Sequence, residues 1–488
     1  MHMQKHSAAL RGAVALGILA GCLSWSASAQ TLDEALPAPL ARAAKQMNIG
    51  LSNMSISVKA LDGTNKTVLS VNAADPVSPA STEKLVTTLA ALELLGPNYH
   101  WLTDFYIDQD PDQQGHIKNL YLKGSGDPSL VIEQFQLEVD RLAAHGISHI
   151  DGDFVVDRSL FDLPPGDTSD FDGKGNRPYN QFPDAALVNY NSMSFEFVPV
   201  PGKSIAHIDT LPPLAGIAVP REIPLGDKPC GNWQKEVGLR FKVLENGQKA
   251  VTFEGVFPKD CDARVFSIVS MDKNEFLERV FRALWEKDGR TWSGHVVDGK
   301  VPDSAKKVLT HASQPLREVV ALANKWSNNQ IARHLFLTTS KVATGRGSDA
   351  PYDLPTSRTM IMRWLQSVGV NTSGWVLDNG SGLSRESRVT ADGMTQMLIR
   401  GWVSPYMSEY MSSLPISGID GTMRKRKAAT TFAHIKTGYL ANVRAIGGYV
   451  QTESGKRYAV FAQIEGGKSV WQGIPFLDRV IEWVHDQE

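Results

Sequence analysis

The pattern of apolar and polar positions near the N-terminal end of the chain predicts a β-hairpin followed by a helix. Apolar residues alternate with polar ones over Met54–Leu61 and Lys66–Val71, with an Asp-Gly turn between them. Apolar residues then recur at helical spacing from Leu85 to Leu95, and Gly96-Pro97 follows as a stop signal. The pattern therefore predicts a helix of roughly four turns that begins at Ser81.

The pattern changes three times along the rest of the chain. Short strands and turn residues dominate from about residue 100 to 260, and a helix is predicted near Lys273–Asp288. Helical spacing prevails from about 314 to 412. Near the C-terminal end follow two β-rich runs, Ala445–Gln451 and Arg457–Gln463, joined by a Ser-Gly turn. We expect an α+β protein in which the N-terminal hairpin joins the sheet just ahead of the Ser81 helix.

The predicted helix that begins at Ser81 carries Lys84 one turn further along the same face. A serine hydroxyl becomes a good nucleophile only beside a base, and a lysine serves as that base only where its surroundings lower its pKa. The positive end of the helix dipole contributes to that effect, and its free N–H groups can stabilise an oxyanion. The alternative interpretation is a capping serine followed by a surface lysine.

A second polar motif, Ser327-Asn328-Asn329, interrupts the helical pattern between Leu316 and Phe336. Small polar residues at such a place indicate a junction that faces a cleft. There Ser327 is expected to relay a proton between Lys84 and a leaving group, and Asn329 to donate to a peptide oxygen of the substrate. A solvated connector without function is the alternative.

A third motif, Lys436-Thr437-Gly438, lies on or beside a strand that begins an antiparallel meander. Lys436 and Thr437 can hold a carboxylate, and Gly438 allows a substrate backbone to approach closely. The N–H group of Tyr439 is then the natural second oxyanion donor, opposite that of Ser81. The alternative is an ordinary lysine at a strand edge.

Taken in order, the three motifs match S-x-x-K, S-x-N and K-T-G, an established signature of penicillin-binding proteins and class A β-lactamases. The stretch between Lys84 and Ser327 is far longer than in β-lactamases. The chain therefore resembles the low-molecular-mass class C penicillin-binding proteins of the penicillin-binding protein 4 type. It has Ser-Asn-Asn where that family often has Ser-Asp-Asn, which is a minor departure.

The resemblance implies an organisation in which two smaller, mainly β domains are inserted into a transpeptidase-like catalytic domain with an antiparallel sheet and flanking helices. The limits expected from the sequence are 1–29 for a signal peptide, 30–98 and 296–488 for the catalytic domain, 99–187 and 263–295 for inserted domain II, and 188–262 for inserted domain III.

The resemblance also implies the chemistry. Ser81 would be acylated, Lys84 would be its base, and Ser327 and Asn329 would complete the proton relay. Lys436 and Thr437 would bind the terminal carboxylate of D-alanine or of a β-lactam. The expected protein is a serine D-Ala-D-Ala carboxypeptidase and D-Ala–diaminopimelate endopeptidase that acts on peptidoglycan peptides and is inhibited by β-lactams.

Two other functions remain open at this point. A wall-binding or sensor protein would be acylated by penicillin without turning over, and steady release of D-alanine distinguishes it from an enzyme. A β-lactamase is disfavoured because the long inserted region has no evident use there and no deacylating glutamate can be identified.

Composition narrows the range of partners. A net charge of −2 and an apolar fraction of 42% describe an ordinary globular protein with no reason to bind nucleic acid. No stretch after the leader is apolar for long enough to span a membrane. No cofactor is expected, and the cysteines have no histidine at a metal-ligand spacing.

The N-terminal segment reads as an export signal, since Lys5 and Arg11 precede an apolar run. Cleavage after Ala29 gives a periplasmic protein, whereas a lipoprotein-type box ending at Cys22 gives a lipid-anchored one. In either case Cys230 and Cys261 remain. An exported pair invites a disulfide, and the alternative is two buried thiols.

Two charged clusters carry weaker hypotheses. The acidic stretch Asp167–Asp172 lies in a Gly- and Pro-rich loop and could meet the amine of a diaminopimelate side chain. The basic run Arg424–Lys427 could meet an anionic wall polymer. For both, a solvated loop is the simpler interpretation.

Overall fold

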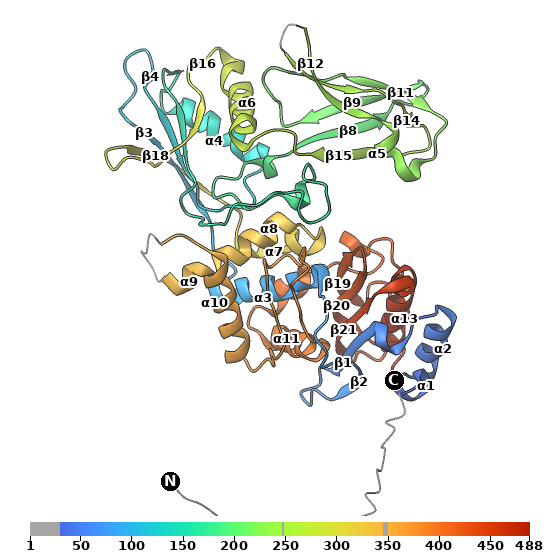
Figure 1. Cartoon of the computed structure of the whole chain (residues 1–488). Coiled ribbons are helices and arrows are strands. Elements are labelled where there is room, and N and C mark those ends of the chain that lie inside the picture. Colours follow the sequence, from blue (N-terminus) through green and yellow to red (C-terminus); the bar gives the residue numbers. More distant parts are fainter. Residues whose placement is uncertain (1–29, 246–247, 345–349) are drawn as a thin grey trace, which may run out of the picture.

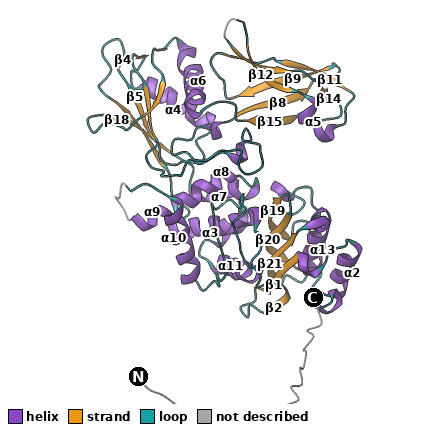
Figure 2. Cartoon of the chain, in the orientation of Figure 1, coloured by secondary structure: helices purple, strands orange, loops and turns teal. Residues whose placement is uncertain are grey.

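The computed structural model describes residues 30–245, 248–344 and 350–488. The expected signal peptide and Cys22 lie outside the described residues. Figures 1 and 2 show a helix-rich body that contains the sheet formed by both ends of the chain, with two strand-rich lobes on one side of it. The mixed α+β class expected from the sequence is confirmed.

The main sheet joins the two ends of the chain in the order β19-β20-β21-β1-β2. Strand β1 pairs antiparallel with both β2 and β21, so the N-terminal hairpin extends the C-terminal meander. Every residue of β20 but the last is buried, because helices cover both faces of the sheet. The strands are β1 Met54–Ala60, β2 Thr67–Val71, β19 Ala433–Leu440, β20 Val443–Gln451 and β21 Arg457–Glu465.

Two helical layers enclose this sheet. On one face, α2 (Ala38–Gln46) and α13 (Gly473–His485) pack their apolar sides against the strands. On the other face lie α3 (Glu83–Leu95), α11 (Ala391–Val403) and the helices around them. Those neighbours are α7 Leu316–Lys325, α8 Asn329–Thr338, α10 Leu354–Ser367 and α12 Met407–Ser412.

The helix predicted to follow Ser81 is confirmed, and most of it is buried in this body. A short 3₁₀ turn, η2 (Ala80–Thr82), precedes α3, whose first ten residues are all buried. Gly96 ends the helix with φ at 86°, a value that favours glycine over residues with a side chain. The nucleophile candidate therefore stands on a rigid element.

The first inserted lobe is built on a sheet of order β17-β7-β5-β3-β18, covered by α4 (Ile132–Ala144) and α6 (Lys273–Trp285). Strand β18 pairs antiparallel with β3, and Leu309 of β18 is buried in this lobe's core. The sheet thus extends to Ala312, beyond the limit at 295 expected from the sequence. Its strands are β3 Leu102–Ile107, β5 Leu120–Lys123, β7 Phe154–Asp157, β17 Val296–Asp298 and β18 Lys306–Ala312.

The second inserted lobe contains a sheet of order β14-β11-β9-β8-β15 and a smaller one of order β10-β13-β12. The strands of the smaller sheet are β10 Ile217–Ala218, β12 Leu239–Val243 and β13 Lys249–Phe253. Because β15 pairs with β8, this lobe extends to Ile268, past the expected limit at 262. We therefore propose that domain II ends near Ala312 and domain III near Ile268. The strands of the larger sheet are β8 Met193–Pro199, β9 Ile205–Leu211, β11 Glu222–Gly226, β14 Phe257–Pro258 and β15 Arg264–Ile268.

Cys230 and Cys261 are joined by a disulfide in this second lobe, with their Cα atoms 5.2 Å apart. Cys261 belongs to the lobe's apolar core together with Phe197 and Phe257. The bond links segments 31 residues apart in sequence. It therefore supports a small core that lies away from the main sheet.

Replacing both cysteines with serine should destabilise the second lobe by about 3–4 kcal/mol, because the unfolded loop regains its freedom. Chemical denaturation followed by tryptophan fluorescence measures the loss. Labelling by a β-lactam should persist, since the lobe contributes no residue to the cleft described below. Unchanged stability would contradict a structural role for this disulfide.

Within the described ranges, no helix combines the length and the apolar character needed to cross a membrane. The C-terminal α13 buries Phe476, Leu477 and Val480 against the main sheet.

Candidate active site

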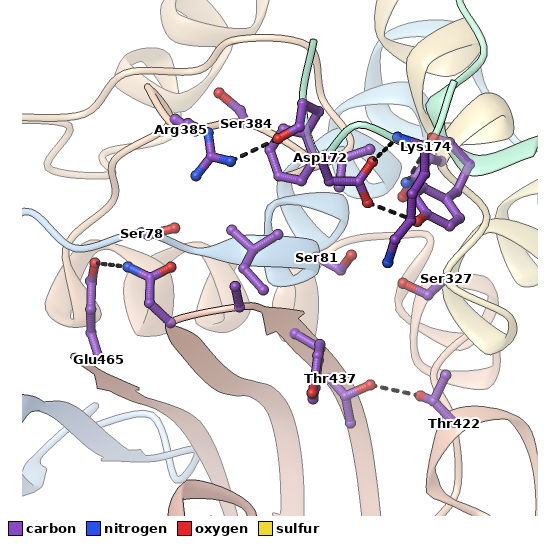
Figure 3. A pocket seen from close by; sticks show the side chains of 18 of the residues that line it. Ser78, Ser81, Asp172, Lys174, Ser327, Ser384, Arg385, Thr422, Thr437 and Glu465 are labelled. Carbon is purple, nitrogen blue, oxygen red and sulfur yellow. Dashed lines mark hydrogen bonds between the residues drawn. The ribbon is translucent and has the colours of Figure 1, made fainter. Parts of the chain in front are cut away.

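The three sequence motifs meet at one cleft of about 620 Å³ between the helical body and the first inserted lobe (Figure 3). Ser81 reaches it from the turn before α3, Ser327 and Asn329 from the junction of α7 and α8, and Thr437 and Tyr439 from strand β19. All five line the cleft. Lys84 and Lys436 are fully buried at its base.

Lys84 is the centre of the hydrogen-bond network. Its Nζ donates to Ser81 Oγ at 3.1 Å, to Asn329 Oδ1 at 2.7 Å and to the carbonyl oxygen of Ser381 at 2.5 Å. Burial lowers the pKa of Lys84 well below its usual range, and the positive charges of Lys436 and Arg333 lower it further. A neutral amine placed in this way can take the proton of the serine hydroxyl.

A glycine-rich loop, residues 378–384, supplies the carbonyl that holds Lys84. Gly382 has φ at 73°, and a Cβ there would lie 1.7 Å from the carbonyl oxygen of Ala80. Thr87 Oγ1 also donates to the carbonyl of Gly380 at 2.7 Å. The loop can therefore pack directly on the segment that carries the nucleophile only because glycine occupies position 382.

Glu83 anchors the same loop, a role that the sequence did not reveal. Its side chain is fully buried, and Oε1 accepts the N–H of Gly380 at 3.0 Å. Burial raises the pKa of Glu83 to about 7, and a hydrogen bond from Ser387 partly opposes that rise. In the sequence Glu83 resembles any acid in a first helical turn.

Ser327 and Asn329 lie at the predicted junction between two helices. Asn328 caps α8 by accepting the N–H of Ile331 at 3.0 Å, and Ser327 has φ at 56°. Ser327 Oγ accepts from Lys436 Nζ at 2.9 Å. In the structure its hydroxyl thus bonds to the second lysine of the site, and the expected proton relay between Lys84 and a leaving group stays a prediction.

The side-chain amide of Asn329 bridges two parts of the molecule. Its oxygen accepts from Lys84, and its nitrogen donates to the carbonyl of Tyr179, in the first inserted lobe, at 3.1 Å. Asn329 was expected to donate to the substrate, but one hydrogen of its NH₂ group is already engaged. The second hydrogen remains for a substrate oxygen.

Lys436 places a second buried amine at the end of the cleft. Its Nζ contacts Ser327 Oγ and, at 2.8 Å, the carbonyl of Thr437. Burial lowers the pKa of Lys436 to about 7. Thr437 Oγ1 donates to Thr422 Oγ1 at 2.9 Å, so hydroxyl groups surround the position that a carboxylate would take.

Gly438 allows a close approach within the protein itself, and its expected role toward a substrate backbone stays a prediction. A Cβ at this position would lie 2.9 Å from the carbonyl oxygen of Pro79 and 3.1 Å from the Cβ of Ala80. The close approach is therefore to the protein's own segment before Ser81. Next to it, the exposed Tyr439 ring lies 3.5 Å from the guanidinium carbon of Arg444.

The first inserted lobe closes one side of the cleft with the loop that contains the acidic stretch. Asp172 lines the cleft and accepts from the Tyr179 hydroxyl and from Asn180 Nδ2, both at 2.8 Å. Arg385 lies nearby and donates to the carbonyl of Phe171 at 2.7 Å (Figure 3). In the parts of the chain that are described, no three His, Cys, Asp or Glu side chains gather to form a metal site.

A profile of the D-Ala-D-Ala carboxypeptidase 3 (S13) family matches residues 36–476. The chain belongs to this family. The expected resemblance to penicillin-binding proteins of this class is thus confirmed, as is the expectation of a D-Ala-D-Ala carboxypeptidase.

Relatives of known name agree with this assignment. A D-alanyl-D-alanine carboxypeptidase of an Actinomadura species is 28% identical over 432 residues, which cover 83% of this chain and 76% of the relative. The carboxypeptidase DacB of Haemophilus influenzae is 23% identical over 426 residues, covering 85% of this chain and 86% of the relative.

Solved structures share the fold. Penicillin-binding protein 4 of Haemophilus influenzae superposes with a TM-score of 0.68 at 22% identity, covering 89% of this chain and 96% of that one. The same protein in complex with a β-lactam gives a TM-score of 0.65 at 23% identity, with the same coverage.

Proposed function

We propose that this S13-family chain is a serine D,D-peptidase that cleaves peptidoglycan stem peptides through an acyl-Ser81 intermediate. The observation that carries the proposal is the contact of a buried lysine of lowered pKa, Lys84, with the hydroxyl of Ser81. A second buried lysine, Lys436, ends the same cleft and suits the carboxylate of a C-terminal D-alanine.

The acylation step follows from these contacts. Neutral Lys84 takes the proton of Ser81 Oγ, and the oxygen attacks the carbonyl carbon of the penultimate D-alanine. The N–H groups of Ser81 and Tyr439 stabilise the oxyanion. When the C–N bond breaks, the proton held by Lys84 passes to the leaving amine with Ser327 Oγ as the relay, which leaves Lys84 neutral again. Water then hydrolyses the ester, with Lys84 again accepting a proton.

The substrate carboxylate binds at Lys436 and the hydroxyls of Ser327 and Thr437. This carboxylate belongs to the terminal D-alanine in a carboxypeptidase reaction. In a cross-linked peptide the residue after the scissile bond is diaminopimelate, which presents a carboxylate on the carbon bearing the scissile nitrogen. One site therefore serves both carboxypeptidase and endopeptidase reactions.

Asp172 and Arg385 supply groups that suit the third stem residue. Both line the cleft, and they offer a carboxylate and a guanidinium on one side of it. The free end of a diaminopimelate side chain carries one amine and one carboxylate, which is the complementary pair. We propose that these residues hold that end.

Replacing Asp172 with asparagine should raise KM about tenfold for stem peptides whose third side chain carries a free amine, because one charge pair is lost. The kcat should change little. For peptides with an acetylated amine, the parent and Asp172→Asn should have the same KM, which provides the matched control. An equal loss on both substrates would rule out recognition of the amine by Asp172.

The alternative of an acylated but inactive sensor is tested by turnover. A synthetic stem pentapeptide should release D-alanine steadily, many equivalents per Ser81. Release of a single equivalent would support the sensor instead. A β-lactamase would hydrolyse penicillin steadily; we expect a long-lived adduct.

We propose that the protein is exported to the periplasm. Support comes from the basic and apolar leader, from the disulfide, and from a substrate that lies outside the cytoplasm. Cleavage after Ala29 and lipidation of Cys22 give different N-termini. The intact mass of the protein purified with its native leader distinguishes them.

A further inference from the structure

Side chains of α8 bind main-chain carbonyl groups of the first inserted lobe. Besides Asn329, Gln330 Nε2 donates to the carbonyl of Pro178 at 3.2 Å. Arg333 Nη1 donates to the carbonyls of Gln181 and Asn180 at 2.7 and 3.5 Å. We call residues 171–184, which run along α8 and over the cleft, the strap.

The far end of this contact is fixed by a buried histidine of α8. His334 Nε2 accepts the N–H of Asp184 at 3.3 Å, so its Nδ1 carries the hydrogen and donates to the carbonyl of Gly126 at 2.9 Å. Side chains of α8 thus hold the strap from Pro178 to Asp184.

Arg333 is unusual among these side chains because it is a buried cation that forms no ion pair within the described residues. Its residue is 8% exposed, and its Nε has no hydrogen-bond partner there. The carboxylate that acts on its charge, Asp378, forms its own ion pair with Arg358. Burying such a charge is costly, and an apolar residue of similar size would pack at lower cost. A role beyond stability accounts for a cation at this position.

The strap connects Arg333 to the reacting groups. The two carbonyls that Arg333 holds directly follow Tyr179, whose own carbonyl accepts from Asn329 Nδ2. That contact sets which end of the amide faces Lys84. If the amide turned over, its NH₂ group would meet the Lys84 amine, and its oxygen would meet the Tyr179 carbonyl.

We infer that Arg333 is a positioning residue for acylation: it fixes the strap on α8, and the strap fixes the side-chain amide of Asn329 against Lys84. This inference rests on the proposed acyl-Ser81 mechanism. The positive charge of Arg333 also favours acylation, since it contributes to the lowered pKa of Lys84. The inserted lobe is in this way part of the catalytic apparatus.

The test measures the acylation rate constant of penicillin at saturation, per titratable site, over a range of pH. Arg333→Gln should slow acylation about tenfold at neutral pH and move the rising limb of the profile to higher pH, because Lys84 loses an alignment partner and a neighbouring charge. Arg333→Lys, which keeps a cationic donor, should recover most of the rate.

Arg290→Gln is the matched control. Arg290 also donates to main-chain carbonyls, those of Trp285 and Leu284, but it lies in the first inserted lobe and does not line the cleft. It should lower stability and leave the rate constant and the pH profile as in the parent. A parental rate and profile for Arg333→Gln, or equal losses in both variants, would overturn the inference.

Gln330→Met provides a second test that removes no charge. This substitution loosens the strap at Pro178 and should slow acylation several-fold. The measurement stays available even if Arg333→Gln does not fold. A parental rate for Gln330→Met in that case would overturn the inference. If the parent itself forms no adduct at Ser81, the proposed function fails and the inference fails with it.

Discussion

Replacing Ser81 with alanine should abolish the release of D-alanine from a stem pentapeptide, lowering kcat by about four orders of magnitude or more. The loss is this large because Lys84, Asn329 and the oxyanion donors act together on one oxygen atom. Without Oγ there is nothing for them to activate. A coupled assay for free D-alanine measures the effect.

Ser78→Ala is the control for this experiment. Ser78 also lines the cleft and lies just before the nucleophile, but no hydrogen bond to Lys84 involves it. The control should retain activity within a few-fold of the parent. Comparable activity in Ser81→Ala and the parent would show that another group is the nucleophile.

Replacing Lys84 with methionine should slow acylation by penicillin about a thousandfold, in the middle of the range seen when a general base is removed. The variant should fold, because methionine fills the same buried space and leaves no charge to compensate. Time-resolved mass spectrometry of the adduct measures the rate. Lys59→Met is the control, since Lys59 is mostly buried and pairs with Asp392 away from the cleft.

The pH profile makes the role of Lys84 specific. In the parent, the acylation rate constant should rise with pH as Lys84 loses its proton. This rise should occur well below the pH at which a free lysine loses its proton, because burial lowers the pKa of Lys84. Lys436, in contrast to Lys84, must keep its proton to act. Its charge, needed for a substrate carboxylate, is present below its pKa of about 7 and is lost as the pH rises through that value.

A profile that rises and then falls is therefore expected for the free enzyme, with affinity for carboxylate ligands decreasing above neutral pH. In Lys84→Met the rising limb should disappear while the falling limb remains. A rising limb that survives unchanged in Lys84→Met would assign the general base to another residue.

Local signals in the sequence were enough to predict the elements that carry the three motifs. The alternation in Met54–Leu61, the helical spacing after Ser81 and the strand at Lys436 each appear in the structure where the pattern placed them. Such elements depend on neighbours in sequence, which is why periodicity and stop signals such as Gly96 suffice.

The limits of the inserted lobes could not be predicted in the same way. Strand β18 directly precedes the helices of the catalytic body, yet it pairs with β3, some 200 residues away in the chain. Strand β15 likewise pairs with β8. Pairing partners at that distance leave no local trace in the sequence.

Three contributors to the site were also beyond the reach of sequence patterns. Glu83 and Arg333 look like surface charges in helical segments, and only tertiary packing buries them. The carbonyl of Ser381 belongs to the main chain, so no side-chain signal marks it. From the sequence Asp172 is one of several acids that could bind an amine, but a solvated loop is the simpler interpretation there.

The most direct test of the account is the intact mass of the purified protein after incubation with a β-lactam, followed by peptide mapping. The account predicts a single adduct, located on the peptide that contains Ser81 and missing from Ser81→Ala, while the untreated parent releases D-alanine from stem peptides. A folded parent that acquires no adduct, or acquires it on another residue, would contradict the proposed acyl-serine site.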